Sequence, residues 1–209
     1  MAFCTVLTTG AAALVLWTAT TVVAQTNFSR IHGFEPRFLP PAHTRICNIK
    51  SAPYNAKGDG VADDTKAFQD ALMAGQMMIY IPAGTYLIKD QLRIRDGIKR
   101  TLWIGEKRTT TVLKLADNSP GFNNPADPKA VLHTRAPLQF GEQNFHHYIY
   151  HRTVEIGKGN PGAIGISHHT NNTGQVKDVC VRATDPVNSK GLIGIQFGDW
   201  WYGPGGGRY

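Results

Sequence analysis

Short apolar runs separated by turn residues dominate the chain after residue 45. The runs that we expect to form buried strands are 77–81, 85–88, 101–104 and 111–115. Each is bounded by Gly, Pro, Asn or other turn-forming residues, as is typical of short strands. Leu92 and Ile94 alternate with Arg93 and Arg95, which places apolar and charged side chains on opposite faces of a further strand. The segment 117–127 is rich in Asn, Pro and Gly, and we expect a loop there.

A helical pattern occurs near the start of this region. Ala67, Phe68, Ala71 and Leu72 recur at the spacing of one helix face, and Gly75 is placed to end the helix. The residues that we expect to form the preceding turn and the helix cap are Gly58, Asp59, Gly60, Asp63, Asp64 and Thr65. A catalytic pair formed by the two adjacent carboxylates is the alternative. Neighbouring residues at a helix start point in different directions, which disfavours that pair.

The last third of the chain contains a repeat. Gly162-Ala-Ile-Gly-Ile166 returns further along as Gly191-Leu-Ile-Gly-Ile195. Thr153-Val-Glu-Ile156 is similar to Asp178-Val-Cys-Val181, so we expect Val154 to align with Val179. Recurrence at such spacing favours coils that each climb one strand separation, about 4.8 Å, over an immunoglobulin-like sandwich. In that register we expect Val154, Ile156, Val179 and Val181 to point inward, and Glu155, Asp178 and Cys180 to point outward.

The first residues differ from the rest. Residues 11–23 carry no charge, and Val22-Val23-Ala24 precedes Gln25 with small residues where a signal peptidase cleaves. We therefore predict a signal peptide at 1–24, an extended Pro-containing arm at 25–45, and one domain at 46–209. A buried strand or a membrane anchor is the alternative, but the apolar run is short for a membrane span. The mature protein is then expected to be secreted, with no membrane segment.

Composition adds a few constraints. A net charge of +7 suits an acidic glycan partner, although ordinary variation in surface charge explains it as readily. No run of Lys and Arg is interleaved with aromatic residues, so the sequence does not favour nucleic acid. Cys47 and Cys180 are expected to be free thiols rather than a disulfide framework. Asn27 and Asn171 start N-glycosylation triplets, which function only in a eukaryotic secretory pathway.

Two blocks of the sequence resemble a known family. They are Asn55-Ala-Lys-Gly-Asp-Gly-Val-Ala-Asp-Asp-Thr-Lys-Ala-Phe-Gln-Asp-Ala-Leu72 with Ile79-Tyr-Ile-Pro-Ala-Gly-Thr-Tyr-Leu-Ile88, and the region 157–181. Both resemble the pectate lyase superfamily domain of the rhamnogalacturonase- and epimerase-like group, which includes exo-β-1,3-glucanases and phage tailspikes. The resemblance covers most of residues 46–198. It implies an all-β, right-handed parallel β-helix whose open apolar end is covered by the short helix.

The resemblance also implies a function. It implies a polysaccharide partner and a hydrolase or lyase acting on a pectin or β-glucan type of substrate. A non-catalytic glycan-binding or adhesion module is the competing hypothesis, and a fragment that does not fold alone is a third. Members of the family usually continue for more coils, so we expect a partial β-helix that is inactive alone, with catalytic residues beyond this chain. No cofactor is expected, and the oligomeric state is open.

Candidate binding residues are few. Glu155 and Asp178 are the best carboxylates for a glycan-binding face, since both are expected on the outside of neighbouring coils. Trp200, Trp201 and Tyr202 suit stacking on sugar rings or closing of the core.

Other polar clusters have more ordinary explanations. Five clustered histidines are candidates for metal ligands: His146, His147, His151, His168 and His169. Their spacing is not that of a zinc motif, so we expect surface or loop positions. The segment 157–162 is similar to a phosphate loop but lacks the following Gly-Lys-Ser/Thr. The segment 105–108 is expected to be a solvated basic turn.

Overall fold

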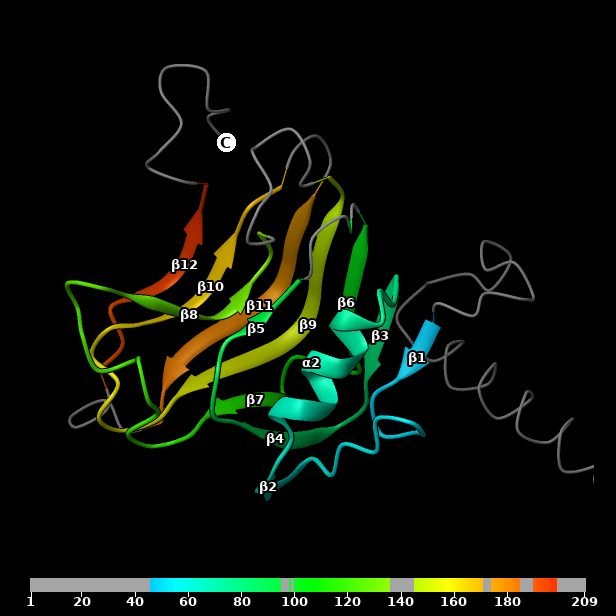
Figure 1. The fold of residues 1–209 in the computed structure, drawn as a ribbon, viewed down its shortest axis with the longest axis horizontal. Coiled ribbons are helices and arrows are strands. Elements are labelled where there is room, and N and C mark those ends of the chain that lie inside the picture. The colour runs from blue at the N-terminus through cyan, green and yellow to red at the C-terminus, as the bar shows by residue number, and fades with distance from the viewer. Residues whose placement is uncertain are drawn as a thin grey trace, which may run out of the picture. The chain divides into compact units, whose positions relative to one another are not determined.

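The computed structural model describes residues 46–94, 98, 100–135, 145–170, 174–184 and 190–198. Twelve strands and one helix lie within these residues. Every strand pairing that the structure records among them is parallel (Figure 1).

The strands form three faces that the chain visits in turn. The first face contains β1 (Ile46–Asn48), β3 (Met78–Ile81), β6 (Thr101–Gly105) and the first half of β9 (His147–Ile156). The second face contains β2 (Asp59–Asp63), β4 (Gly84–Ile88), β7 (Thr111–Leu115) and the second half of β9. The third face contains β5 (Leu92–Arg93), β8 (Lys129–His133), β10 (Ala163–His168) and β12 (Ile193–Phe197). β11 (Gln175–Ala183) pairs along β9. This order is that of a right-handed parallel β-helix, as the sequence predicts.

A sharp corner joins the first two faces. His151 and Asp178 have φ angles of 55° and 51°, so β9 and β11 turn from one face to the next while they stay paired. The left-handed region is costly for most residues but less so for Asp, Asn and His. In the preceding coil the same corner holds Gly105, where a Cβ atom would lie 1.9 Å from the carbonyl oxygen of His151. Only glycine fits this close approach.

The register confirms one predicted repeat and corrects the other. Ile164 pairs with Ile193 and Ile166 with Ile195, which confirms the glycine-framed repeat. The predicted alignment of Val154 with Val179 is wrong, because Val154 pairs with Val181. A shift by two leaves each side chain on its predicted face. Alternation alone therefore could not distinguish the two registers.

The predicted directions of these side chains hold. Val154 and Ile156 are buried in the core, and Val179 and Val181 pack against it while partly exposed. Close packing requires glycine at Gly165, whereas a Cβ atom on the matching Gly194 would have its nearest neighbour, Val181 Cβ, at 3.9 Å. A Cβ atom on Gly165 would lie 2.5 Å from Val181 Cγ1, so the side chains of the second face fill the space above it.

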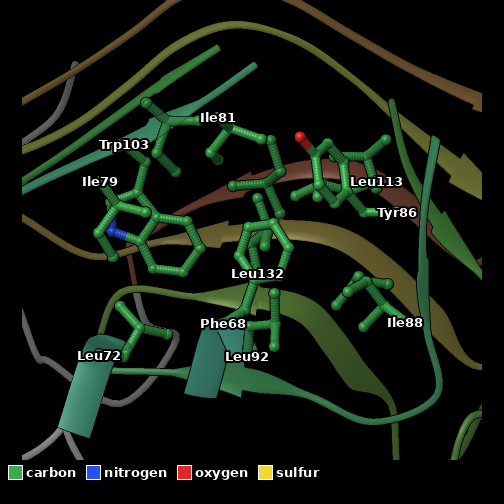
Figure 2. Packing of buried hydrophobic residues seen from close by; sticks show 14 of the residues in the cluster. Phe68, Leu72, Ile79, Ile81, Tyr86, Ile88, Leu92, Trp103, Leu113 and Leu132 are labelled. Carbon is green, nitrogen blue, oxygen red and sulfur yellow. The ribbon is translucent and has the colours of Figure 1, made fainter. Parts of the chain in front are cut away.

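Helix α2 (Thr65–Met73) covers the first coil at the position of a third-face strand, as predicted. It buries Phe68, Ala71 and Leu72. Figure 2 shows Phe68 and Leu72 directed into the same interior as Trp103. The rings of Phe68 and Tyr86 meet edge to face, with centroids 5.3 Å apart.

The side chain of one helix residue replaces a strand partner for β5. The Gln69 amide donates to Arg93 O at 2.9 Å and accepts from Arg93 N at 3.1 Å. The helix thus covers the apolar end and also pairs with the edge of the first third-face strand.

The turn before the helix is held by buried carboxylate contacts. Asp64 is 2% exposed and accepts N–H bonds from Lys57 at 2.6 Å and Gly58 at 2.9 Å. Asp64 stands at the N-cap position, yet its side chain makes no bond to the helix. The expectation that its carboxylate caps the helix is therefore wrong, because the carboxylate is used by the turn. Gly58, with φ of 62°, allows that turn.

The other turn residues also bind backbone groups. Asp59 Oδ1 accepts from Val61 N and Ala62 N, at 2.9 and 2.8 Å. The intervening Gly60 has a φ of 80°, which allows the chain to turn back toward the Asp59 side chain. Asp63 Oδ1 accepts from Thr65 N at 3.0 Å, and Thr65 Oγ1 accepts from Lys89 N at 2.8 Å. All three carboxylates of this segment thus hold backbone amides.

The interior contains one cation among the described residues. Arg152 is fully buried, and its guanidinium lies 5.8 Å from the ring centroid of Trp103. It donates to Tyr150 O at 3.4 Å, while Nη1 has no hydrogen-bond partner. Burial lowers the pKa of Arg152 to about 9. Within the same described ranges the structure records no ion pair for this side chain, so its charge is poorly compensated.

We predict that Asp64→Ala lowers the free energy of unfolding by about 3 kcal/mol, since two backbone amides of the turn lose a buried, charged acceptor. Denaturant unfolding monitored by circular dichroism measures this loss. Asp63→Ala is the matched control, because Asp63 is half-exposed and serves one amide. Equal losses for the two variants would contradict the special role of Asp64.

Replacing Arg152 with methionine is predicted to leave stability unchanged or to raise it by about 1–4 kcal/mol, because a buried charge is exchanged for an apolar side chain of similar length. Thermal unfolding at neutral pH measures the change. Arg108→Met, at a partly exposed ion pair, serves as the control. A drop of several kcal/mol for the Arg152 variant alone would show that the charge has an unrecognised partner.

Candidate functional site

The outer side of the third face is hollowed into a groove of about 540 Å³. It runs across β5, β8, β10 and β12, together with the loop before β8. The lining residues are Gln91, Arg93, Gly121, Asp127, Pro128, Lys129, Ala130, His133, Ile164, Ser167, His169 and Gln196. Among these, Asp127 is the one carboxylate.

Strand register arranges the centre of the groove as a row. Arg93 pairs with His133, His133 with Ser167, and Ser167 with Gln196. Since neighbouring strands lie about 4.8 Å apart, four polar side chains cross the face at that spacing. The alternation of Leu92 and Arg93 predicted the outward direction of Arg93, because Leu92 is buried in the core.

The cations of the groove are positioned by local contacts. Lys129 Nζ lies 2.5 Å from Asp90 Oδ1 and 5.0 Å from the ring centroid of Phe122. Arg93 Nε donates to Arg135 O at 3.0 Å, which draws the two arginines together beside the histidines. A planar guanidinium at such a place suits a carboxylate, which it can bind through two parallel hydrogen bonds.

Two histidines in the groove are held neutral. The rings of His133 and His169 have centroids 5.2 Å apart. Burial, then the neighbouring His169, Arg93 and Arg135, lower the pKa of His133 to about 3. Burial, then Arg135 and Arg93, lower the pKa of His169 to about 4. Near neutral pH both imidazoles are therefore uncharged and can accept hydrogen bonds, beside cations that attract an anion.

Hydrogen bonds fix His169. Ser167 Oγ lies 2.9 Å from His169 Nε2. Thr134 Oγ1 accepts from His169 N at 2.6 Å and donates to His169 O at 2.8 Å. The adjacent coil thus clamps the backbone on both sides of this imidazole.

The predicted glycan-face carboxylates lie elsewhere. Glu155 and Asp178 are outward, as expected, but they belong to β9 and β11 and line no part of the groove. Glu155 accepts from Arg182 Nε at 2.8 Å. Asp178 contacts His151 Nδ1 and Arg108 Nε, each at 2.8 Å, and these bonds hold its pKa below the usual range. Asp178 lies at the corner, four positions before Arg182, and Arg182 pairs with Glu155. The backbone positions of Asp178 and Glu155 are therefore about 13 Å apart along the strands. The structure does not bring them together.

The expectation of surface or loop positions is wrong for His147 and His168, which are buried in strands, whereas His169 follows β10 outside a strand but is also buried. His147, His168 and His169 are 0%, 2% and 7% exposed. Burial, then the neighbouring histidines, lowers the pKa values of His147 and His168 to about 3 and 4. Alternation along β10 was the available signal, because Ser167 and His169 are two residues apart and so share a face. The basic turn at 105–108 is solvent-exposed beyond the buried Gly105.

Several predicted residues fall outside the described part of the chain. They are residues 1–45 with Asn27, and Asn171, Trp200, Trp201 and Tyr202. Cys47 and Cys180, which are described, are free thiols. Within the described ranges there is no cluster of three or more His, Cys, Asp or Glu side chains placed to hold a metal. No helix there is both long and apolar enough to cross a membrane.

Comparison with known proteins gives several partial relatives. A glucan 1,3-beta-glucosidase of Cochliobolus carbonum is 34% identical over 111 residues, which is 42% of this chain and 14% of that protein. Mannuronan C5-epimerase AlgE5 of Azotobacter vinelandii is 40% identical over 78 residues, which is 34% of this chain and 8% of the epimerase. The chain thus spans a small part of either relative.

A solved structure and a family complete the comparison. PfbA, a surface adhesin of Streptococcus pneumoniae, is 22% identical and has a TM-score of 0.44, over 65% of this chain and 33% of that one. The family described as rhamnogalacturonase A/epimerase, pectate lyase-like matches residues 46–198, which is well over half of the chain. The match begins at β1 and ends just beyond β12, so it spans the β-helix seen in the structure. The chain belongs to the rhamnogalacturonase A/epimerase, pectate lyase-like family.

Proposed function

We propose that the chain binds a polysaccharide that carries carboxylate groups, and that the groove on the third face is the binding site. The observation that carries the proposal is the juxtaposition of cationic and neutral polar groups in one row. Arg93 lies next to His133, which lies next to Ser167, with Lys129 on the same strand as His133. Carboxylates suit the cations, and sugar hydroxyls suit the neutral groups.

The repeating architecture supports a polymeric ligand. Successive coils present side chains at intervals of about 4.8 Å, so a chain of sugar units meets a regular series of contacts. Gln196 extends the row into the last described coil, and Gln91 lies beside Arg93 in the first coil of the face. A groove open along its length suits an extended ligand better than a compact one.

Electrostatics supports an acidic ligand. The whole chain has a net charge of +7, which favours encounter with polyanions. Within the groove, the pKa values of His133 and His169 are lowered partly by Arg93 and Arg135, which is the local effect of a positive field. A bound carboxylate would offset the positive charge beside these histidines.

The enzyme class is part of the proposal. By their names, the two relatives above act on a glucan and on mannuronan, which supports a carbohydrate-active protein of hydrolase or lyase type. A non-catalytic binding or adhesion module remains the alternative for this chain. Both need the groove to hold a glycan, and release of reducing ends or unsaturated products from a bound polysaccharide separates them.

We predict that Arg93→Gln weakens binding of polygalacturonate about tenfold or more, since a charge-assisted hydrogen bond contributes roughly 1.5–3 kcal/mol. Isothermal titration calorimetry at low salt measures the affinity, and added salt should reduce it. Neutral β-1,3-glucan should bind more weakly than polygalacturonate.

Arg108→Gln is the matched control, because it removes the same charge on the second face. Its affinity for polygalacturonate should stay within about twofold of the unaltered protein. Equal weakening by the two variants would mean that net charge, not the groove, drives binding. Preference for the neutral glucan would sink the acidic-ligand proposal.

The location of the protein is a further part of the proposal. The uncharged run at 11–23 and the small residues before Gln25 support cleavage of a signal peptide after Ala24 and export of the rest. N-terminal sequencing of protein collected from the culture medium is expected to start at Gln25. Recovery only from cells, with Met1 or Ala2 as the first residue, would contradict export.

A further inference from the structure

Two side chains of the groove are placed as a nucleophile and its base. Ser167 Oγ lies 2.9 Å from His169 Nε2, and both residues line the groove while 3% and 7% exposed. With the imidazole proton on Nδ1, Nε2 accepts the proton of the serine hydroxyl. A serine hydroxyl becomes a useful nucleophile when a neutral imidazole can take its proton in this way.

The base is held rigidly. The hydroxyl of Thr134 accepts from the backbone N–H of His169 and donates to its carbonyl oxygen. The ring of His133 packs beside the His169 ring. Thr134 is therefore a positioning residue, since it fixes the imidazole without facing the groove itself.

Charges around His169 make its basicity depend on the ligand. After burial, Arg135 from the residues following β8 and Arg93 from β5 lower the pKa of His169, while His133 and His168 are the histidines beside it. The two arginines disfavour the imidazolium in the free protein. A carboxylate bound by Arg93, which lines the groove, would offset part of this charge and strengthen the base. An acidic ligand thus prepares the pair for proton transfer.

We propose that Ser167 and His169 cleave short-chain acyl esters, such as acetate esters, carried by an acidic polysaccharide in the groove. This inference rests on the proposed function, because the polysaccharide brings the ester to the serine. It adds an ester-cleaving activity to a site whose family resemblance implied action on the sugar chain.

The reaction has two balanced steps. First, Ser167 Oγ attacks the ester carbonyl carbon while His169 Nε2 takes the hydroxyl proton. The bond from the acyl carbon to the sugar oxygen then breaks, and that oxygen leaves with the proton from His169. Second, water gives a proton to His169 and attacks the acyl-serine. The carboxylic acid is released, and the serine oxygen recovers its proton from the imidazole. One ester and one water yield one hydroxyl and one acid.

The direct test is acetate release from acetylated polygalacturonate by the full chain. We expect Ser167→Ala and His169→Gln each to lower the rate at least about a hundredfold, the scale of losing a positioned base. Ser119→Ala is the matched control, because Ser119 is also buried, yet its hydroxyl contacts a loop carbonyl outside the groove. Its rate should be unchanged.

A second measurement does not depend on the variants folding well. A fluorophosphonate probe should add covalently to Ser167 of the unaltered protein, as found by peptide mass spectrometry, and prior binding of polygalacturonate should change the labelling rate. Absence of label on Ser167 together with absence of acetate release would overturn the proposal.

Binding measured in parallel separates this proposal from the one on which it rests. Ser167→Ala should weaken binding of polygalacturonate much less than Arg93→Gln does, because it keeps the charged groups of the groove. Binding without acetate release by the unaltered protein would overturn the esterase and leave the proposed function standing. Equal acetate release by Ser167→Ala would also overturn it. Absence of glycan binding by the unaltered protein would overturn both the esterase proposal and the proposed function.

Discussion

The parallel register between coils is the constraint on which the rest of the structure depends. Each residue lies directly over a residue of the coil before it, so side chains form columns. Ile79, Trp103 and Ile149 make one such column on the inside. The same register makes the outward row from Arg93 to Gln196 on the third face. One geometric rule thus builds both the core and the groove.

Columns of side chains inside the β-helix meet a different environment from columns on its outer surface. Inside, an ionised group is removed from water, and within the described ranges the recorded contacts of the Arg152 guanidinium are one carbonyl and one aromatic ring. Outside, charges can pair across coils. Glu155 pairs with Arg182 and Asp178 with Arg108, which compensates charges on the second face. The third face also has an ion pair, between Lys129 and Asp90, and it places Arg93 beside two histidines whose pKa values are lowered. The faces therefore differ electrostatically although they share one architecture.

Local patterns predicted the elements well. Strand runs, the helix with Phe68 and Leu72 inward, and the glycine-framed repeat follow from periodicity within short segments. Contacts between coils were less accessible. Side chains alternate with a period of two, so the pattern aligns Val154 with Val179 as readily as with its true partner, Val181. His133 and His169 lie on neighbouring strands of the third face, separated in sequence by one full coil that includes β9. No local pattern gives the length of that coil. Glu155 and Asp178 were predicted from their outward direction alone, which says nothing about their partners.

The central claim is that the third face holds the polysaccharide, and hydrogen–deuterium exchange with and without polygalacturonate tests it most directly. Binding in the groove should slow exchange in β8, in β10 and in the residues just after them, which carry Arg135 and His169. The same ligand should leave exchange in β7 and in the second half of β9 unchanged. Protection centred on Glu155 and Asp178, with none in β8 or β10, would contradict the account and place the ligand on the second face.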